Sequence, residues 1–151
     1  MPEPPESAAA PPGATVVDAT GLVLGRAASH IAKRLLNGEA IVVVNAEKSV
    51  VTGSRRTVLE HYVAARARGS KRTGPHFPRN PDRIFRRTVR GMLPHLKTRG
   101  RVAFGHLEVH IGVPDAWKGA PAQTIETARA RPALRPPMTL AEITRLLGAH
   151  V

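Results

Sequence analysis

The sequence predicts an α/β protein, because two β-branched runs enclose a segment with helical periodicity. The first run is TVVD at residues 15–18. The second is AIVVVN at residues 40–45, which is apolar at five successive positions, as is typical of a parallel strand covered on both faces. Between the runs, apolar residues recur at helical spacing, at positions Leu24, Ala28, Ile31 and Leu35. A strand, a helix and a strand in this order indicate a β-α-β unit.

The length and composition favour one folded domain. A chain of 151 residues, 42% of them apolar, is long enough to bury a single core. Residues 1–13, rich in Pro, Ala and Glu, are expected to form a disordered tail. We expect an α/β domain over residues 14–115 and a C-terminal extension over residues 116–151. The sequence has no cysteine, no secretory signal and no apolar run of membrane-spanning length, which favours a soluble cytoplasmic protein.

Two helices are predicted in the first half of the chain. Gly38 follows the first helix and is expected to end it as a C-terminal cap. A short apolar run at residues 49–52 leads to the second helix, which we expect over residues 54–68. Its inward face is assigned to three residues, Leu59, Tyr62 and Val63.

The second half contains an extended loop, a strand and a short helix. Two glycines and three prolines predict the loop over residues 69–81. Residues 107–111 alternate strictly between apolar and polar side chains, and we predict that they form the last strand. A capping box, TLAE at residues 139–142, predicts a short helix near residues 140–147 that packs as a satellite on the domain.

Positive charge is concentrated in one part of the chain. The formal net charge is +12. Residues 66–101 hold twelve basic residues and a single acid, Asp82, so the rest of the chain is nearly neutral. Basic residues at this density repel one another unless a polyanion neutralises them, and nucleic acid and anionic membrane are the cellular polyanions. We call residues 66–101 the basic segment.

A basic amphipathic helix is predicted within the basic segment. With Asn80 or Asp82 near its N-cap, residues 83–93 advance about 100° each. Four arginines then share one stripe, namely Arg83, Arg86, Arg87 and Arg90. The opposite stripe is expected to pack on the domain and consists of Ile84, Phe85, Thr88, Val89 and Met92. Gly91 is expected to leave room for a close approach, and residues 95–101 to form a loop with three more cations.

Nucleic acid is the favoured partner of this helix. A merely solvated charged face normally carries acids three or four residues from its bases, and residues 83–93 contain none. Its apolar side holds one aromatic residue, which suits packing on protein better than lying on lipid. Arginine outnumbers lysine, and the guanidinium fork suits bidentate phosphate contacts. The chain lacks the spacing of the usual major-groove modules and has too few aromatic residues to read bases by stacking, so folded RNA is favoured over DNA.

Two blocks of the sequence resemble a known family. The stretch GPHFPRNPDRIFRRTVRGMLPH, followed by KTRGRVAFGHLEVHIGVP, and the earlier stretch VVDATGLVLGRAASHIAKRLLNGEAIVVVNAEKSVVTG are similar to the large-subunit ribosomal protein thirteen family, in its archaeal and eukaryotic branch. The resemblance spans residues 16–114. It implies a three-layer α/β/α fold with a four-stranded, largely parallel sheet, here with a basic helix-loop extension and a short C-terminal helix.

The resemblance also implies a function. A protein of this family is expected to be a structural constituent of the large ribosomal subunit. It would bind and organise large-subunit ribosomal RNA during assembly and would contact neighbouring ribosomal proteins. The RNA-binding role is carried over to the basic residues of the matching block, Arg79, Arg83, Arg86, Arg87, Arg90, Lys97, Arg99 and Arg101. The charge of the basic segment adds Arg66, Arg68, Lys71 and Arg72.

A nucleotide-dependent α/β enzyme is the alternative from another class. Gly21 and Gly25 are too far apart for a dinucleotide-binding fingerprint, and no P-loop is present. His106 and His110 would lie about 13 Å apart on a strand, too far to share a metal ion. Asp18 follows the first strand without a second carboxylate or a nucleophile, so we expect it to cap a turn. We expect no cofactor, no metal and no small-molecule substrate.

Overall fold

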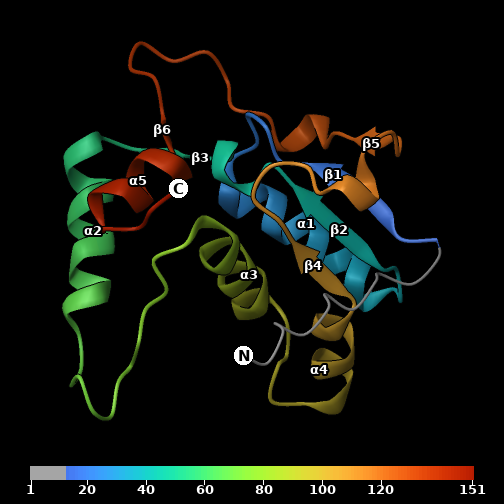
Figure 1. Cartoon of the computed structure of the whole chain (residues 1–151), viewed down its shortest axis with the longest axis horizontal. Helices are drawn as coiled ribbons and strands as arrows, with labels where there is room; N and C mark the ends of the chain where they lie inside the picture. The colour runs from blue at the N-terminus through green and yellow to red at the C-terminus, as the bar shows by residue number, and fades with distance from the viewer. Residues whose placement is uncertain (1–12) are drawn as a thin grey trace.

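The computed structural model describes residues 13–151 and contains one four-stranded sheet with a small two-stranded pair beside it (Figure 1). Apart from Gly13, the predicted N-terminal tail lies outside the described residues. The main sheet has the order β4-β2-β1-β5, and each pairing is parallel. Its strands are β1 (Thr15–Asp18), β2 (Ile41–Val44), β4 (Leu107–Val109) and β5 (Ala122–Gln123). The antiparallel pair consists of β3 (Val50–Val51) and β6 (Met138–Thr139).

Within residues 13–151, five α-helices accompany the sheet, so the predicted α/β class with four largely parallel strands is confirmed. They are α1 (Leu24–Leu36), α2 (Arg55–Ala67), α3 (Pro81–Met92), α4 (Thr98–Gly105) and α5 (Leu140–Leu146). The described residues also contain three short 3-10 helices, which are η1 (Ala46–Lys48), η2 (Asp115–Trp117) and η3 (Glu126–Ala128). In the part of the chain that the structure describes, no helix combines the length and the apolar character that crossing a membrane requires.

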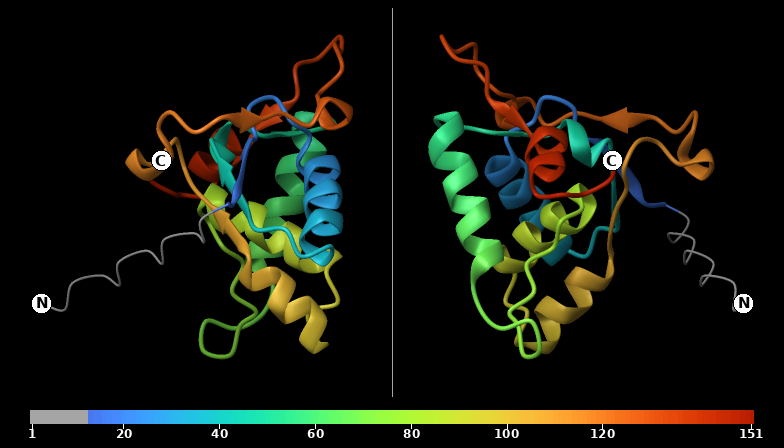
Figure 2. Two further views of the ribbon diagram at one scale, coloured as in Figure 1. Left: turned by 90° about the vertical axis from the view of Figure 1, so that its right-hand side faces the viewer. Right: turned by 60° about the vertical axis from the view of Figure 1, so that its left-hand side comes forward.

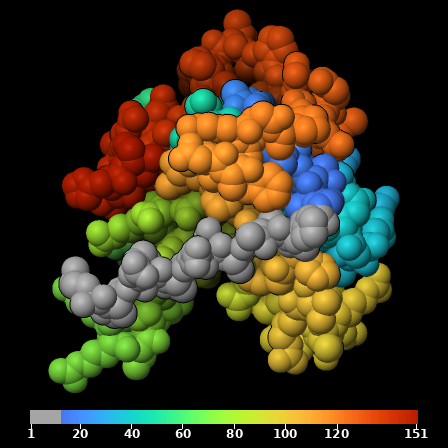
Figure 3. Space-filling view, turned by 45° about the vertical axis from the view of Figure 1, so that its right-hand side comes forward, coloured from blue at the N-terminus to red at the C-terminus, as the bar shows by residue number. Residues whose placement is uncertain are grey.

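Both faces of the sheet are buried, as the apolar run in β2 predicted. Val17 and Val43 face the core that α1 and α3 complete, where Phe85 is fully buried. On the opposite face, Val16, Val42 and Val44 are covered by Trp117 and Ala120. Figure 3 shows this orange segment lying against the blue first strand. The segment around η2 therefore forms only a thin layer on this face of the sheet. Helices α1 and α3 form a thicker layer on the other face.

The inward face of α2 differs from the prediction. Val58 and Tyr62 are buried, whereas Leu59 is half-buried and Val63 is 54% exposed. Helix α2 stands at the edge of the molecule (Figure 1) and contacts the body through a narrow stripe. Val63 lies about 100° beyond Tyr62 around the helix axis, so it falls outside this stripe.

The predicted loop at residues 95–101 is wrong, because a new helix, α4, begins at Thr98. A tight connection follows α3, with a hydrogen bond from the Lys97 N–H to the Pro94 carbonyl at 2.9 Å. Gly100 makes this connection possible, since a Cβ there would lie 2.1 Å from the Pro94 oxygen. The packing of α4 on the preceding turn therefore requires a glycine at position 100.

The C-terminal extension is part of the core. Residues 107–111 were predicted to be the last strand, but β5 and β6 follow, and β5 extends the main sheet beside β1. The expectation of a satellite helix is wrong too, because Leu140 and Ile143 of α5 are fully buried in the main core. The predicted cap is confirmed, since the Thr139 hydroxyl accepts a hydrogen bond from the Glu142 N–H at 3.3 Å.

The basic segment occupies one end of the molecule. The loop after α2 and helix α4 form two projections at the lower end in both views of Figure 2, and the segment that leads to β6 lies at the opposite end. Helix α3 lies between the projections, and Figure 3 shows the surface hollowed between them.

Candidate nucleic-acid interface

Helix α3 places its arginines on one face and its apolar residues on the other. Pro81 lies in the first turn, where a missing N–H removes no intrahelical hydrogen bond, and Asp82 adds a negative charge near the positive end of the helix dipole. Ile84, Phe85 and Val89 are at most 1% exposed. The other side is exposed to solvent and carries the predicted arginines Arg83, Arg86, Arg87 and Arg90. We call these four residues the arginine ridge.

The C-terminal turn of α3 departs from the prediction at Met92 and at Gly91. Met92 is 43% exposed instead of buried, and Leu93, which follows the helix, is buried in its place. Gly91 takes part in no close approach within residues 13–151, because a Cβ at this position would meet no atom of these residues within 4 Å. Thr88, half-buried as the apolar stripe requires, donates its hydroxyl hydrogen to the Ile84 carbonyl at 2.9 Å.

The arginine ridge is not neutralised by the protein's own acids. Within residues 13–151, none of the twelve predicted RNA-binding residues has a carboxylate oxygen within 4.0 Å. Elsewhere the protein does pair its charges, as between Arg34 and Glu39 at 2.7 Å. Asp82, the one acid on α3, forms no ion pair with the ridge within the described residues, and its Oδ1 is buried without a hydrogen-bond partner. The charge of the ridge is therefore available to an external anion.

Two phenylalanines hold neighbouring guanidinium groups of the ridge. Cζ of Arg86 lies 4.7 Å from the ring centroid of Phe104 on α4, and Cζ of Arg87 lies 5.0 Å from that of Phe77 in the loop after α2. Such a contact contributes about 0.5–1 kcal/mol at exposed sites. A guanidinium stacked on a ring keeps its edge N–H groups free to bind an anion. Neither aromatic partner was predicted from the sequence.

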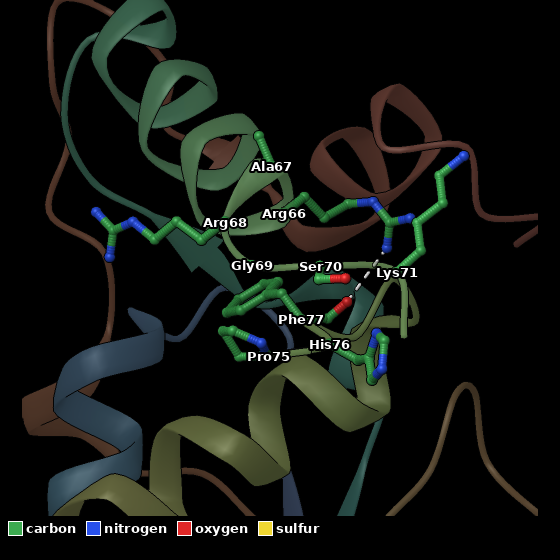
Figure 4. Close-up of a pocket in the computed structure, with 9 residues that line it drawn as sticks. All are labelled: Arg66, Ala67, Arg68, Gly69, Ser70, Lys71, Pro75, His76 and Phe77. Carbon is green, nitrogen blue, oxygen red and sulfur yellow. Dashed lines mark hydrogen bonds between the residues drawn. The ribbon is translucent and has the colours of Figure 1, made fainter. Parts of the chain in front are cut away.

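The loop after α2 is held in place through Phe77. Its ring meets the ring of Tyr62 edge-on, with centroids 6.0 Å apart. Its carbonyl oxygen accepts a hydrogen bond from Nη1 of Arg66 at 3.2 Å, across a hollow of about 350 Å³ (Figure 4). Figure 4 also shows Arg68 and Lys71 pointing in different directions. Because these cations diverge, they suit an extended chain of phosphates better than one small ligand.

The remaining predicted cations lie on the flanks of the ridge. Lys97 is the N-cap of α4, and Arg99 and Arg101 are exposed on that helix. Arg79 reaches toward Gly148 at the end of α5. Of the twelve residues, eleven are exposed and Arg66 is half-buried. The structure thus brings the four ridge arginines onto one face and distributes the other eight over the two projections and the start of α3.

Comparison with protein families decides to which family the chain belongs. A family model described as ribosomal protein L13 matches residues 13–116. The chain belongs to the ribosomal protein L13 family. The match includes the strands β1, β2 and β4 and the whole basic segment. The resemblance seen in the two sequence blocks is thereby confirmed.

Archaeal proteins are similar to this L13-family chain over most of its length. The large ribosomal subunit protein uL13 of Archaeoglobus fulgidus is 54% identical, over 89% of this chain and 87% of that protein. The protein of the same name from Methanococcoides burtonii is 45% identical, over 89% of this chain and 98% of that protein. The L13 family is structural, so the prediction of a non-enzymatic protein is confirmed. The large ribosomal subunit in these names is a cytoplasmic particle, which agrees with the predicted location.

The catalytic-looking carboxylate of this L13-family protein caps a turn, as predicted. Oδ1 of Asp18 accepts hydrogen bonds from the Thr20 N–H at 3.0 Å, the Thr20 hydroxyl at 2.7 Å and the Asn45 amide at 3.1 Å. Burial raises the pKa of Asp18, but these hydrogen bonds and the charge of Lys48 outweigh it and hold the pKa below its ordinary value. The carboxylate is therefore ionised at neutral pH, and its Oδ1 holds the turn at Thr20 and the side chain of Asn45.

The two histidines near β4 do not form a metal site. His106 ends α4, and Nε2 of His110 lies 3.3 Å from a carboxylate oxygen of Glu108. Over residues 13–151, no three His, Asp or Glu side chains converge in a way that could hold a metal ion.

Proposed function

We propose that this protein is a structural constituent of the large ribosomal subunit and that it binds and organises large-subunit ribosomal RNA during assembly. The observation that carries the proposal is the arginine ridge, four exposed guanidinium groups on one helical face with no carboxylate within ion-pair distance in residues 13–151. Like charges on adjacent helical turns repel each other by a few tenths of a kcal/mol per pair. Phosphate groups remove this repulsion and bind guanidinium in a bidentate manner.

The fold supports this function by fixing the ridge relative to the sheet. The apolar side of α3 is anchored in the core by Ile84, Phe85 and Val89, so the arginines do not depend on a mobile tail for their position. The two projections, which lie on either side of α3 (Figure 1), carry further exposed cations. This arrangement binds the RNA backbone through its shape and through ionic contacts with phosphate groups. It does not read bases by stacking, since only 3% of the residues are aromatic.

Neighbouring large-subunit proteins are the second class of partner that we propose. Leu134 and Leu146 are 107% and 55% exposed, and both belong to the C-terminal extension and not to the basic segment. Exposed leucines outside the RNA-binding surface suit contacts with protein in the assembled ribonucleoprotein.

Retention in the large subunit tests the proposed function. A tagged protein with Arg83→Glu, Arg86→Glu and Arg90→Glu is compared with the parent and with a control that carries Arg26→Glu, Arg131→Glu and Arg135→Glu. The parent and the control should stay in the large-subunit peak of a sucrose gradient after a high-salt wash, and the ridge variant should be lost from it. Because the ridge makes no internal ion pair and the Arg86–Phe104 contact contributes only about 0.5–1 kcal/mol, the purified variant should melt within a few degrees of the parent. Equal retention of all three proteins would refute the proposal.

A further inference from the structure

Gly91 is a glycine inside α3 that the fold itself does not require. Its φ is not in the positive range that favours glycine, and a Cβ on it would meet no atom of the described residues within 4 Å. A glycine within a helix is less favourable than alanine by about 0.5–1 kcal/mol. Within residues 13–151, neither a turn nor a close packing contact accounts for this loss of stability. A binding partner whose backbone approaches the helix at this point would account for it.

The surroundings of Gly91 show what could approach. Gly91 lines a hollow of about 200 Å³ together with Arg87, Arg90 and His95. The Arg87 guanidinium is held on the Phe77 ring, and Nδ1 of His95 lies 3.4 Å from the Leu93 carbonyl oxygen, which tethers the imidazole. Two guanidinium groups and an imidazole thus surround a stretch of helix without a side chain.

We propose that one phosphate group of the RNA backbone sits in this hollow, against the bare helix at Gly91 and between the side chains of Arg87, Arg90 and His95. This inference rests on the proposed function and names where on α3 the closest backbone approach occurs. The lining is cationic, and the face of the Phe77 ring is already covered by Arg87, so the hollow suits an anion and not a stacked base. A side chain at residue 91 would hold the phosphate farther from both guanidinium groups.

The substitution Gly91→Ala tests the inference, with Gly25→Ala on α1 as its matched control. Gly25 is also an exposed helical glycine whose Cβ would meet no atom within 4 Å, and it lies outside the hollow. The probe is large-subunit ribosomal RNA transcribed in vitro, in a filter-binding assay at several salt concentrations. Gly91→Ala should melt at the same temperature as the parent or higher and bind about tenfold more weakly, the value of one charge-assisted hydrogen bond. Its log-log salt slope should fall by about 0.7–0.9, the contribution of one phosphate contact.

The outcomes separate this inference from the proposed function. If the parent binds RNA and Gly91→Ala binds with the same affinity and slope, the phosphate seat is refuted and the proposed function stands. If Gly25→Ala weakens binding as much as Gly91→Ala, the effect is not local and the seat is refuted as well. If the parent shows no salt-dependent affinity for the RNA, the proposed function and the seat fail together.

Discussion

At the scale of single residues, the ridge arginines differ in how firmly they are held. Arg86 and Arg87 each lie on an aromatic ring, whereas no such contact holds Arg83 or Arg90 within the described residues. An oriented guanidinium loses less conformational entropy when it binds a phosphate than a freely rotating one does. Phe104 therefore acts as a positioning residue for Arg86, although it carries no charge itself.

Replacing Phe104 tests this positioning role. Phe104→Leu keeps an apolar side chain but removes the ring, so RNA affinity should fall about two- to fivefold, which corresponds to the 0.5–1 kcal/mol of an exposed cation–π contact. Phe104→Tyr keeps the ring and should bind as the parent does. Filter binding gives the affinities, and thermal melting reports any change in stability. If the Leu and Tyr variants bind equally well, Phe104 does not position Arg86.

Only part of this residue-scale arrangement could be predicted from the sequence. The arginines of the ridge follow from helical periodicity, which is a local property of α3. Phe77 and Phe104 come from other segments of the chain, and their contacts with Arg87 and Arg86 depend on tertiary packing. The protein has three phenylalanines, and these two flank the predicted helix, which was the one available signal.

At the scale of elements, α5 is the least expected part of the core. Ile143 is fully buried in the cluster that also holds Phe85, while Leu146 on the same helix is 55% exposed. Helix α5 therefore contributes to the stability of the body that carries α3, and it is more than an appendage.

A pair of alanine substitutions on α5 tests this role. Ile143→Ala should lower the free energy of unfolding by about 2–5 kcal/mol, because it leaves a cavity in the core. Leu146→Ala should change it by less than about 0.5 kcal/mol. Denaturant unfolding followed by circular dichroism measures both, and a single transition is expected for each variant. A small effect of Ile143→Ala, or an early separate transition, would show that α5 is a satellite after all.

The other elements show where sequence patterns succeed and fail. The strong periodicity of α1 and α3 and the capping box of α5 identified these helices from local signals. Helix α4 was missed because Gly100 and the surrounding charge favour a loop locally, and the packing of Gly100 on Pro94 overrides this preference. Strand β5 was missed because Ala122 and Gln123 are both exposed and give no alternating pattern.

At the scale of the whole molecule, the structure separates most of the core from most of the positive charge. The nearly neutral remainder of the chain supplies the sheet and much of the core, and the basic end supplies most of the positive charge. Helix α3 belongs both to the core and to the basic end. Its buried apolar side therefore keeps the helix in position when its arginines attract a polyanion. A basic surface of this size also attracts RNA over distances of about 8–10 Å at ordinary ionic strength.

The salt dependence of RNA binding tests this account most directly. The parent and a neutral ridge variant with Arg83→Gln, Arg86→Gln and Arg90→Gln are titrated with large-subunit ribosomal RNA at increasing salt. Three lost phosphate contacts should reduce the log-log slope by about two to three, while the variant melts within a few degrees of the parent. An identical slope in a folded variant would contradict the claim that the ridge faces phosphate.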